Sequence, residues 1–451
     1  MSGYAEYREV NLPWLKAVPA HWEIRRNKNI FTEQKEIVGE RSADYTLLSL
    51  TLNGIIPRDM DGGGKFPESF DKYKIVKNGD MAFCLFDIDE TPRTVGLSGY
   101  NGMLTGAYTI MRVSNINARF IYYYYLALDN GKMLRPLYTG LRKTININTF
   151  QSTKVPVPPR EEQDQIVCFL DWKVSSINKL INIKKKEIKA IDALKRSTVS
   201  HAITRGLTAD APTKYSGVKW LGDIPAHWNV TKLRQILHPV SEKNHPEFPL
   251  LSVVREQGVI LRDVEDKEAN HNFIPDDLSG YKVVRKGQFA MNKMKAWQGS
   301  YGVSDYIGIV SPAYFIFDIA FENLEYFHYA IRSKVYVNFF AQASDGIRVG
   351  QWDLQMDKMK EIPFIVPPAD EQIAIVKYIK KALPRYDAAI EKLTEEVAVL
   401  EEYKNKIIAD TVTGKIDVRS IEIPEYEFVD EDIDNADENL EQGADEPPEE
   451  E

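Results

Sequence analysis

The chain has 451 residues, of which 43% are hydrophobic and 27% are charged, a balance typical of globular proteins with two or three domains. No run of 18 apolar residues and no basic-then-apolar N-terminal segment occurs, so we expect neither a membrane span nor a secretion signal. Its only cysteines are Cys84 and Cys168, which excludes a disulfide framework and a four-thiolate zinc site. We therefore expect a cytoplasmic protein that makes no contact with membranes.

The net charge of −9 is unevenly distributed along the chain. Residues 421–451 contain 15 acidic residues and no Lys or Arg, which leaves 57 basic against 51 acidic side chains over residues 1–420. A mildly basic body permits nucleic-acid binding without demonstrating it. We interpret the acidic end as a disordered, solubilising tail, and the alternative is a DNA mimic that competes for the basic surface.

The predicted elements form one series that occurs twice. Their ranges, in chain order, are strands over 46–50, 80–86 and 108–113, helices over 120–129 and 160–205, strands over 250–254, 288–292 and 313–318, and helices over 322–332 and 369–414. Each half of the chain thus predicts a globular unit of strands and a short helix, followed by a long helix.

Two motifs confirm that the series is a duplication. Val18 to Trp22 (VPAHW) recurs at an offset of 206 as Ile224 to Trp228 (IPAHW). Pro158 to Gln163 (PPREEQ) recurs at an offset of 209 as Pro367 to Gln372 (PPADEQ). A repeat of this length is far above the 20–50 residues of solenoid proteins. The chain is therefore a duplicated unit, and a duplicated recognition unit fits a target with two halves.

The long helical segments carry apolar residues at alternating spacings of four and three. These residues are Leu170, Val174, Ile177, Ile181, Ile188 and Ile191 in the first, and Tyr386, Ile390, Leu393, Val397, Leu400 and Ile407 in the second. Narrow stripes of this kind favour a coiled-coil seam. An antiparallel pair would relate the two globular units by a pseudo-twofold axis. Pro384 lies inside the second segment and is predicted to kink or split it.

Patterns that carry catalysis are not found in the sequence. There is no phosphate-binding GxxxxGK[ST] loop, no metal-binding spacing among the seven histidines and no nucleophile–base signature. His21 and His227 recur beside tryptophans; we interpret them as scaffold residues, with a catalytic pair as the alternative. The sequence thus favours a binding protein that holds no metal and no cofactor of its own.

Four loop-like stretches mix basic and amide side chains with glycine, the residue types that contact phosphates and read base edges. They cover residues 91–96, 140–144, 292–299 and 346–351. The candidate DNA-binding residues in or beside them are Arg93, Arg142, Lys143, Lys293, Lys295, Gln298, Arg348 and Gln351. Ordinary solvated loops are the alternative. Trp297 and Trp352 fit a core as well as an interface. The basic runs at 184–186 and 195–196 are interpreted as a solvated helix face, with DNA contact as the alternative.

The repeated motifs, in this order, resemble those of the specificity subunits of type I restriction–modification systems over residues 12–418. Thr411 to Asp417 resembles the closing motif of that family, with a looser counterpart over 202–207, whereas Pro384 and the acidic end depart from the family pattern. The resemblance implies an α/β protein with two mixed α/β target recognition domains in tandem. Long α-helices would separate and follow these domains and would pair as an antiparallel coiled coil with pseudo-twofold symmetry.

The resemblance also implies the boundaries and partners of each part. We expect target recognition domains over 1–157 and 208–366, spacer helices over 158–207 and 367–418, and the acidic disordered tail over 419–451. The chain would recognise a bipartite, asymmetric double-stranded DNA site and dock two modification (methyltransferase) subunits and restriction/translocase subunits. It would be non-catalytic, with S-adenosylmethionine, ATP and magnesium on the partner subunits. The alternatives are a coiled-coil adaptor or scaffold without DNA recognition and a fused nuclease, against which the missing motifs count.

Overall fold

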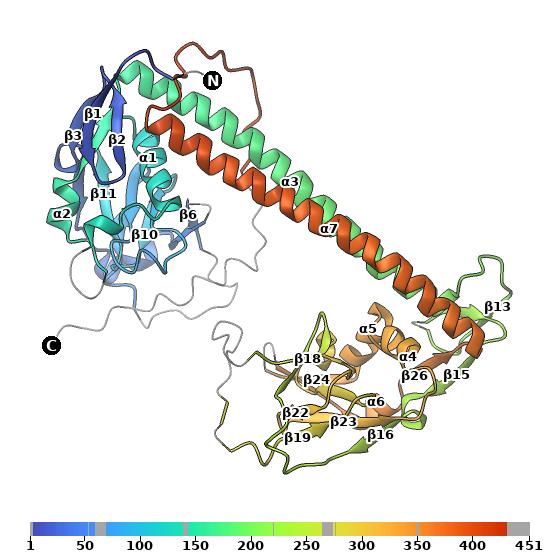
Figure 1. Ribbon diagram of the computed structural model, residues 1–451. Helices are drawn as coiled ribbons and strands as arrows, with labels where there is room; N and C mark the ends of the chain where they lie inside the picture. The colour runs from blue at the N-terminus through green and yellow to red at the C-terminus, as the bar shows by residue number, and fades with distance from the viewer. Residues whose placement is uncertain are drawn as a thin grey trace. The chain divides into compact units, whose positions relative to one another are not determined.

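The computed structural model describes residues 3–52, 54–58, 69–138, 143–219, 221–263, 274–275, 277–348 and 351–430, with the main chain alone at 347, 348 and 351 (Figure 1). The chain divides into two compact units. Unit 1 contains Met1–Lys186 and Leu393–Glu451, and unit 2 contains Glu187–Lys392. Since both divisions fall inside long helices, each unit combines one globular part with a portion of each helix.

A four-stranded antiparallel sheet lies at the centre of unit 1. Its strands, in spatial order, are β4 (Phe31–Gln34), β11 (Thr109–Val113), β8 (Asp80–Phe83) and β9 (Val95–Leu97). Helix α1 (Ala118–Asn130) begins where the Asn117 side chain accepts hydrogen bonds from the amides of Arg119 and Phe120. The ring of Tyr125 on α1 packs against Phe83 at 5.1 Å between centroids, which joins this helix to the sheet.

Smaller antiparallel pairs and short helices surround the sheet of unit 1. The pairs are β1 (Tyr7–Leu12) with β2 (Leu15–Pro19), β3 (Glu23–Arg26) with β12 (Lys154–Val157), β5 (Leu48–Thr51) with β6 (Gly54–Pro57), and β7 (Lys74–Val76) with β10 (Gly102–Leu104). The short helices are α2 (Ile147–Ser152) and the 3-10 helices η1 (Asn27–Asn29), η2 (Gly39–Asp44) and η3 (Arg135–Leu137).

Unit 2 repeats this topology strand for strand. Its central sheet has the order β16 (Leu237–Val240), β23 (Tyr314–Ile319), β20 (Phe289–Asn292) and β21 (Tyr301–Val303). The surrounding pairs are β13 (Thr213–Tyr215) with β14 (Asp223–Pro225), β15 (Asn229–Lys232) with β26 (Pro363–Val366), β17 (Leu251–Val254) with β18 (Gly258–Leu261), and β19 (Lys282–Val284) with β22 (Gly308–Val310). The sequence repeat is therefore a repeat of the fold.

Unit 2 also contains short helices and one further hairpin besides these strands. It carries the helices α4 (Leu324–Ile331), α5 (Lys334–Gln342) and α6 (Met356–Lys360), the hairpin of β24 (Ser344–Arg348) with β25 (Gln351–Leu354), and the 3-10 helices η4 (Leu233–Gln235) and η5 (Ala296–Gln298). Rings of Phe289, Tyr301, Phe327 and Phe364 belong to one large buried cluster.

The long helices α3 (Arg160–Arg205) and α7 (Ala369–Val412) lie antiparallel within each unit. In unit 1, Lys184 on α3 pairs with Glu396 on α7 at 2.8 Å, and Lys404 donates to Asn178 Oδ1 at 3.3 Å. In unit 2, Lys195 and Asp387 approach to 2.5 Å. Rising residue numbers on α3 meet falling numbers on α7. The lysines that interrupt the apolar stripes, Lys184 and Lys404, therefore face polar partners on the other helix.

Pro384 was predicted to kink or split the second long helix, and the split does not occur, because α7 continues through it. The kink stays a prediction. Proline removes the amide that would bond the carbonyl of Lys380. Both residues are exposed, so water can reach the carbonyl that has lost its intrahelical donor. The helix thus tolerates proline at an exposed position, whereas proline in a buried stretch of helix would leave a carbonyl without any hydrogen-bond donor.

The first part of the acidic tail expected over residues 419–451 makes hydrogen bonds within unit 1. Residues 419–430 lie along α3, where the side chains of Ser175, Asn178 and Asn182 donate hydrogen bonds to their main chain (Figure 1). Residues 431–451 lie outside the described part of the chain. The composition of the acidic end suggested one uniform segment, whereas main-chain contacts, which composition does not reveal, hold its first part.

Candidate nucleic-acid interface

The two repeated motifs meet in each unit at a carboxylate near the start of a long helix. In unit 1, Glu162 accepts hydrogen bonds from Trp22 Nε1 at 2.9 Å and from Tyr4 Oη at 2.5 Å, and His21 Nε2 lies 2.7 Å from its second oxygen. Glu162 is 5% exposed. The hydroxyl of Tyr4 has a pKa raised above its usual value, chiefly by burial and also by the bond to Glu162.

Unit 2 repeats this arrangement in a more exposed form. Trp228 Nε1 donates to Glu371 at 2.9 Å, and His227 Nε2 lies 2.5 Å from the same carboxylate. The carboxylate of Glu371 is 36% exposed. Each repeated histidine therefore helps to fasten the start of a globular unit to the helix that follows it, which supports the scaffold interpretation.

Each unit is closed by the end of the other repeat's helix. Gly414, just after α7, has φ +76°, and a Cβ there would lie 2.4 Å from Pro19 and 3.2 Å from Trp22 of unit 1. Gly206, just after α3, has φ +74°, and a Cβ there would lie 3.0 Å from Trp228 of unit 2. Glycine meets both the positive φ and the close approach. The closing motif of the sequence is thus a contact with the repeated tryptophan.

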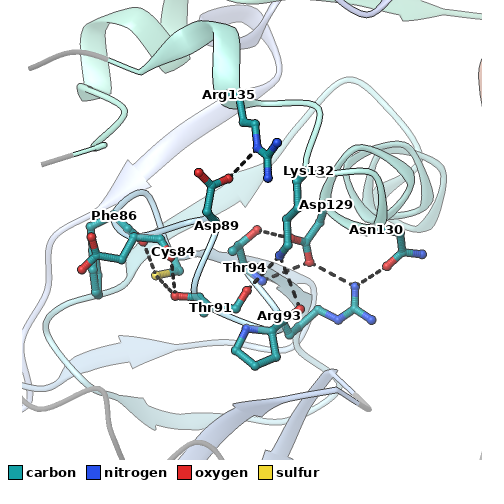
Figure 2. Close-up of polar contacts among 12 residues, drawn as sticks. Cys84, Phe86, Asp89, Thr91, Arg93, Thr94, Asp129, Asn130, Lys132 and Arg135 are labelled. Atoms are coloured by element: carbon teal, nitrogen blue, oxygen red, sulfur yellow. Dashed lines mark hydrogen bonds and ion pairs between the residues drawn. The ribbon is translucent and has the colours of Figure 1, made fainter. Parts of the chain in front are cut away.

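In unit 1, Asp129 at the end of α1 holds the β8–β9 loop (Figure 2). Its carboxylate accepts hydrogen bonds from the amide of Thr94 at 3.0 Å and the hydroxyl of Thr94 at 2.6 Å. It also accepts from Arg93 Nη1 at 3.0 Å and from Lys132 Nζ at 2.9 Å. Arg93 donates further to Asn130 and is only 13% exposed. The structure therefore places Arg93 in an ion pair that positions the loop.

The second candidate stretch of unit 1 approaches the same loop. Lys143 is half exposed and lies 3.9 Å from Asp89 and 3.6 Å from Glu90. Asp89 accepts a hydrogen bond from Arg135 Nε at 2.7 Å (Figure 2). It also accepts one from Tyr138 Oη at 3.0 Å. The bond from Arg135 lowers the pKa of Asp89, while burial and the bond to Asp89 raise the pKa of Tyr138 to about 12. Asp89 is thus ionised and Tyr138 is protonated at neutral pH. Arg142 lies outside the described residues.

The candidate stretches of unit 2 also lie together. Lys293 pairs with Asp353 on β25 at 3.1 Å, and its carbonyl accepts from the amide of Leu354. The rings of Trp297 and Trp352 are 5.7 Å apart, with Trp297 half-buried and Trp352 38% exposed. Lys295 is exposed and Gln298 is half-buried. The main chains of Arg348 and Gln351 are paired in the β24–β25 hairpin, whereas their side chains lie outside the description.

Sequence reasoning missed the acidic residues that organise both loops. Asp89, Asp129 and Asp353 each neutralise or position a basic candidate. Their spacing in the chain carries no pattern, because each meets its partner only through the fold. The basic helix residues are also paired: Lys195 with Asp387 and Arg196 with Asp192, at 2.7 Å for the second pair. These ion pairs agree with the interpretation of a solvated helix face, because the basic side chains are neutralised within the protein.

Within the described ranges, no group of three His, Cys, Asp or Glu side chains is arranged to hold a metal ion. Burial raises the pKa of the Cys84 thiol to about 11, so this cysteine remains a protonated, unreactive thiol at neutral pH. None of the helices in the described part is long and apolar enough to cross a membrane.

Comparisons with known proteins agree on one family. Residues 70–193 match the type I restriction modification DNA specificity domain. Two proteins of Methanocaldococcus jannaschii are similar over nearly the whole chain. The type I restriction enzyme MjaVIII specificity subunit is 24% identical over 446 residues, covering 92% of this chain and 98% of its own. The putative type I restriction enzyme MjaX specificity subunit is 23% identical over 436 residues, covering 89% and 95%.

A solved structure shows the same fold at greater sequence distance. It comes from work on complex assembly and conformational transition of the type I restriction–modification system. The match has a TM-score of 0.57 and 12% identity, and covers 88% of this chain and 99% of the other. The family match over residues 70–193 and the two relatives that align along almost their full length lead to one conclusion: the chain is similar to the specificity subunits of type I restriction–modification systems.

Proposed function

We propose that the chain recognises a bipartite, asymmetric site on double-stranded DNA, with one half-site read by the globular part of each unit. The observation that carries this proposal is that one topology occurs twice with different loops. The β8–β9 loop of unit 1 and the corresponding loop after β20 in unit 2 have different residues and different partners. The same scaffold with different reading loops predicts two unlike half-sites.

The exposed and half-exposed candidates supply the DNA contacts. Lys143 and Lys295 would neutralise phosphates, while Lys293 and Gln298 lie beside the hairpin that carries Arg348 and Gln351. Arg142 belongs with Lys143 by its place in the sequence. Arg93 differs from the others, because its ion pair with buried Asp129 gives it the role of positioning the loop.

The paired helices α3 and α7 would act as the coiled coil that sets the spacing of the half-sites. They would also bind two modification subunits, and restriction/translocase subunits would then join this complex. S-adenosylmethionine, ATP and magnesium would be held by those partners, in keeping with the family's role as a non-catalytic specificity subunit. The cytoplasm, where the host DNA lies, is the proposed location.

Exchange of one reading unit tests the proposal. Residues 1–155 are replaced by the corresponding segment of another specificity subunit, with Trp22 and Pro19 retained so that Gly414 still fits. In complex with the modification subunits, the hybrid should methylate a motif in which one half is changed and the other is kept. The measurement is mapping of methylated adenines in DNA exposed to the complex.

A reciprocal exchange of residues 208–366 serves as the matched control and should change the opposite half. A hybrid that changes both halves at once contradicts the assignment of one half-site to each unit. If the wild-type complex shows no DNA binding across a salt series, the adaptor alternative replaces DNA recognition.

A further inference from the structure

The C-terminal segment over residues 418–430, here called the strap, runs along α3 in unit 1. Gln165 Nε2 donates to the carbonyls of Val418 and Ile421, at 3.0 and 2.8 Å. Further along, Ser175 Oγ donates to the carbonyl of Glu427 at 3.0 Å and accepts from the amide of Val429 at 2.8 Å. Strap residues of rising number therefore meet α3 residues of rising number.

Two asparagines complete the contact beyond Ser175. Asn178 Nδ2 donates to the carbonyl of Val429 at 3.2 Å, and Asn182 Nδ2 donates to the carbonyl of Asp430 at 2.9 Å. Ser175, Asn178 and Asn182 are 2%, 6% and 6% exposed, so their polar groups are buried with the strap in place. Buried polar groups are stable only when they are hydrogen-bonded, and the strap supplies partners here.

Over residues 427–430 the donors of α3 bind the main chain of the strap, whereas Val418 at its start has a buried side chain. Tyr426 and Phe428 are 40% and 52% exposed, although they stand next to the bonded carbonyls. Arg119 lies 6.0 Å from the centroid of Phe428, and Arg419 at the start of the strap lies 5.0 Å from the ring centroid of Tyr4. The main chain over residues 427–430 is thus held by donors on positions of α3 that are three and four residues apart.

The duplication shows that these donors are particular to α3. The helices begin at residues 160 and 369, so the offset of 209 places Pro384, Asp387 and Glu391 of α7 at the positions of Ser175, Asn178 and Asn182. Proline and ionised carboxylates have no proton to donate to a carbonyl. The α7 copy of the helix therefore lacks the donors that bind the strap.

The helix pairing explains how Asn178 serves two partners. Lys404 of α7 corresponds to Lys195 of α3 at the same offset. In unit 2, Lys195 pairs with Asp387, whereas in unit 1 Lys404 donates to Asn178 Oδ1. An amide at this position keeps the acceptor for the lysine and adds a donor for the carbonyl of Val429.

We propose that α3 carries a binding site whose ligand is a polypeptide main chain without regular secondary structure and whose occupant is the chain's own strap. The site covers one face of α3 in unit 1, and the equivalent positions of α7 in unit 2 cannot form it. The two repeats thus offer different helix surfaces to any partner, despite their shared topology. This proposal concerns a site separate from the DNA contacts and does not rest on the proposed DNA recognition.

Exchange of the α7 residues into α3 tests the site in the full-length chain. The variant Asn178→Asp/Asn182→Glu keeps an acceptor for Lys404 and removes both amide donors to the strap. We expect chymotryptic cleavage after Phe428 and exchange of the Val429 amide with deuterium to become about tenfold faster or more, because hydrogen bonds that hold the strap are lost. Both are measured without DNA or partner subunits.

Matched variants distinguish the loss of the strap contact from a general destabilisation of the protein. Asp387→Asn/Glu391→Gln makes the reverse change on α7, away from the strap, and should leave cleavage and exchange at the strap unchanged. Ser175→Ala is a smaller change that removes the acceptor of the Val429 amide, and it should also accelerate both. The proposal is overturned if neither α3 variant accelerates them, or if the α7 control accelerates them equally.

Discussion

At the scale of single residues, buried polar side chains fasten segments that are distant in the sequence. Glu162 gathers Tyr4, His21 and Trp22, and Asp129 gathers Arg93, Thr94 and Lys132. In each case one carboxylate satisfies several donors from other segments. Removing such an acceptor leaves buried donors without a partner, which is more harmful than losing an exposed ion pair.

Glu162 and Glu371 allow this difference to be measured within one chain. Glu162→Ala leaves Trp22 Nε1 and Tyr4 Oη without their acceptor in a buried setting, so unit 1 should lose about 2–4 kcal/mol of stability. Glu371→Ala should destabilise unit 2 less, since water can reach the more exposed site. Hydrogen exchange as a function of urea follows each unit separately. Equal losses in the two units would contradict the role of burial.

His328 makes the stability of unit 2 depend on pH. Its Nδ1 accepts from the amide of Val303 at 3.3 Å, and burial, aided by nearby Arg332, lowers its pKa to about 4, against the weaker opposing effect of Asp305 and Glu325. In the unfolded chain, His328 binds a proton once the pH falls below its ordinary pKa near 6.5. In the folded unit, it binds this proton only near pH 4. Stability should therefore be constant above pH 6.5 and fall as the pH drops towards 4.

Between pH 7.5 and 5 the expected loss is about 2 kcal/mol. Urea unfolding of unit 2 at the two pH values measures it, with unit 1 as the internal reference. His328→Gln should remove this part of the pH dependence. A wild-type unit 2 whose stability is the same at both values would show that His328 is protonated in the folded state.

At the scale of elements, local patterns account for the long helices and for two strands of each central sheet. The apolar stripes predicted helices over 160–205 and 369–414, and α3 and α7 match them to within two residues. Gly206 and Gly414 then end these helices with a left-handed residue against a tryptophan. The exception to the local rules is Pro384, which a propensity argument would place at a helix end.

Pro384→Ala should stabilise unit 2, because it restores an amide donor to the carbonyl of Lys380 and removes an unfavourable residue from a helix interior. The gain should be up to about 3 kcal/mol, the usual difference between proline and alanine in that setting. Urea unfolding of unit 2 measures it. Lys381→Ala, at a neighbouring exposed position, is the control and should change stability by only a few tenths of a kcal/mol. If Pro384→Ala left the stability of unit 2 unchanged, proline would not destabilise this turn of α7, and the prediction would be wrong.

At the scale of the whole molecule, the duplication does not simply place two independent domains in series. The end of α7 closes unit 1 against Trp22, and the end of α3 closes unit 2 against Trp228. Each unit therefore requires residues from both halves of the chain. Hybrids that exchange a reading unit should keep these junction residues, so that the incoming part meets the helix end that closes it.

The sequence by itself determined the duplication, the long helices, three strands in each repeat and the family resemblance, because these depend on periodic apolar patterns and on short motifs that occur twice. The predicted resemblance to specificity subunits is confirmed by the family match and the relatives, and the assignment of single DNA-contacting residues stays a prediction. The sequence did not predict that the candidate stretches lie near one another within each unit; the ion pairs of Lys143 with Asp89 and of Lys293 with Asp353 show it.

Only the tertiary structure showed which of the basic candidates form ion pairs within the protein. It also showed that the first residues of the acidic end contact α3. Arg93 meets Asp129 across 36 residues, and Ser175 meets Glu427 across 252. No local pattern records such pairs, since they arise when the fold brings distant segments into contact. The same reason explains why Pro384 is tolerated and why the strap begins as an ordered part of unit 1: burial and partner geometry, set by the whole fold, override composition.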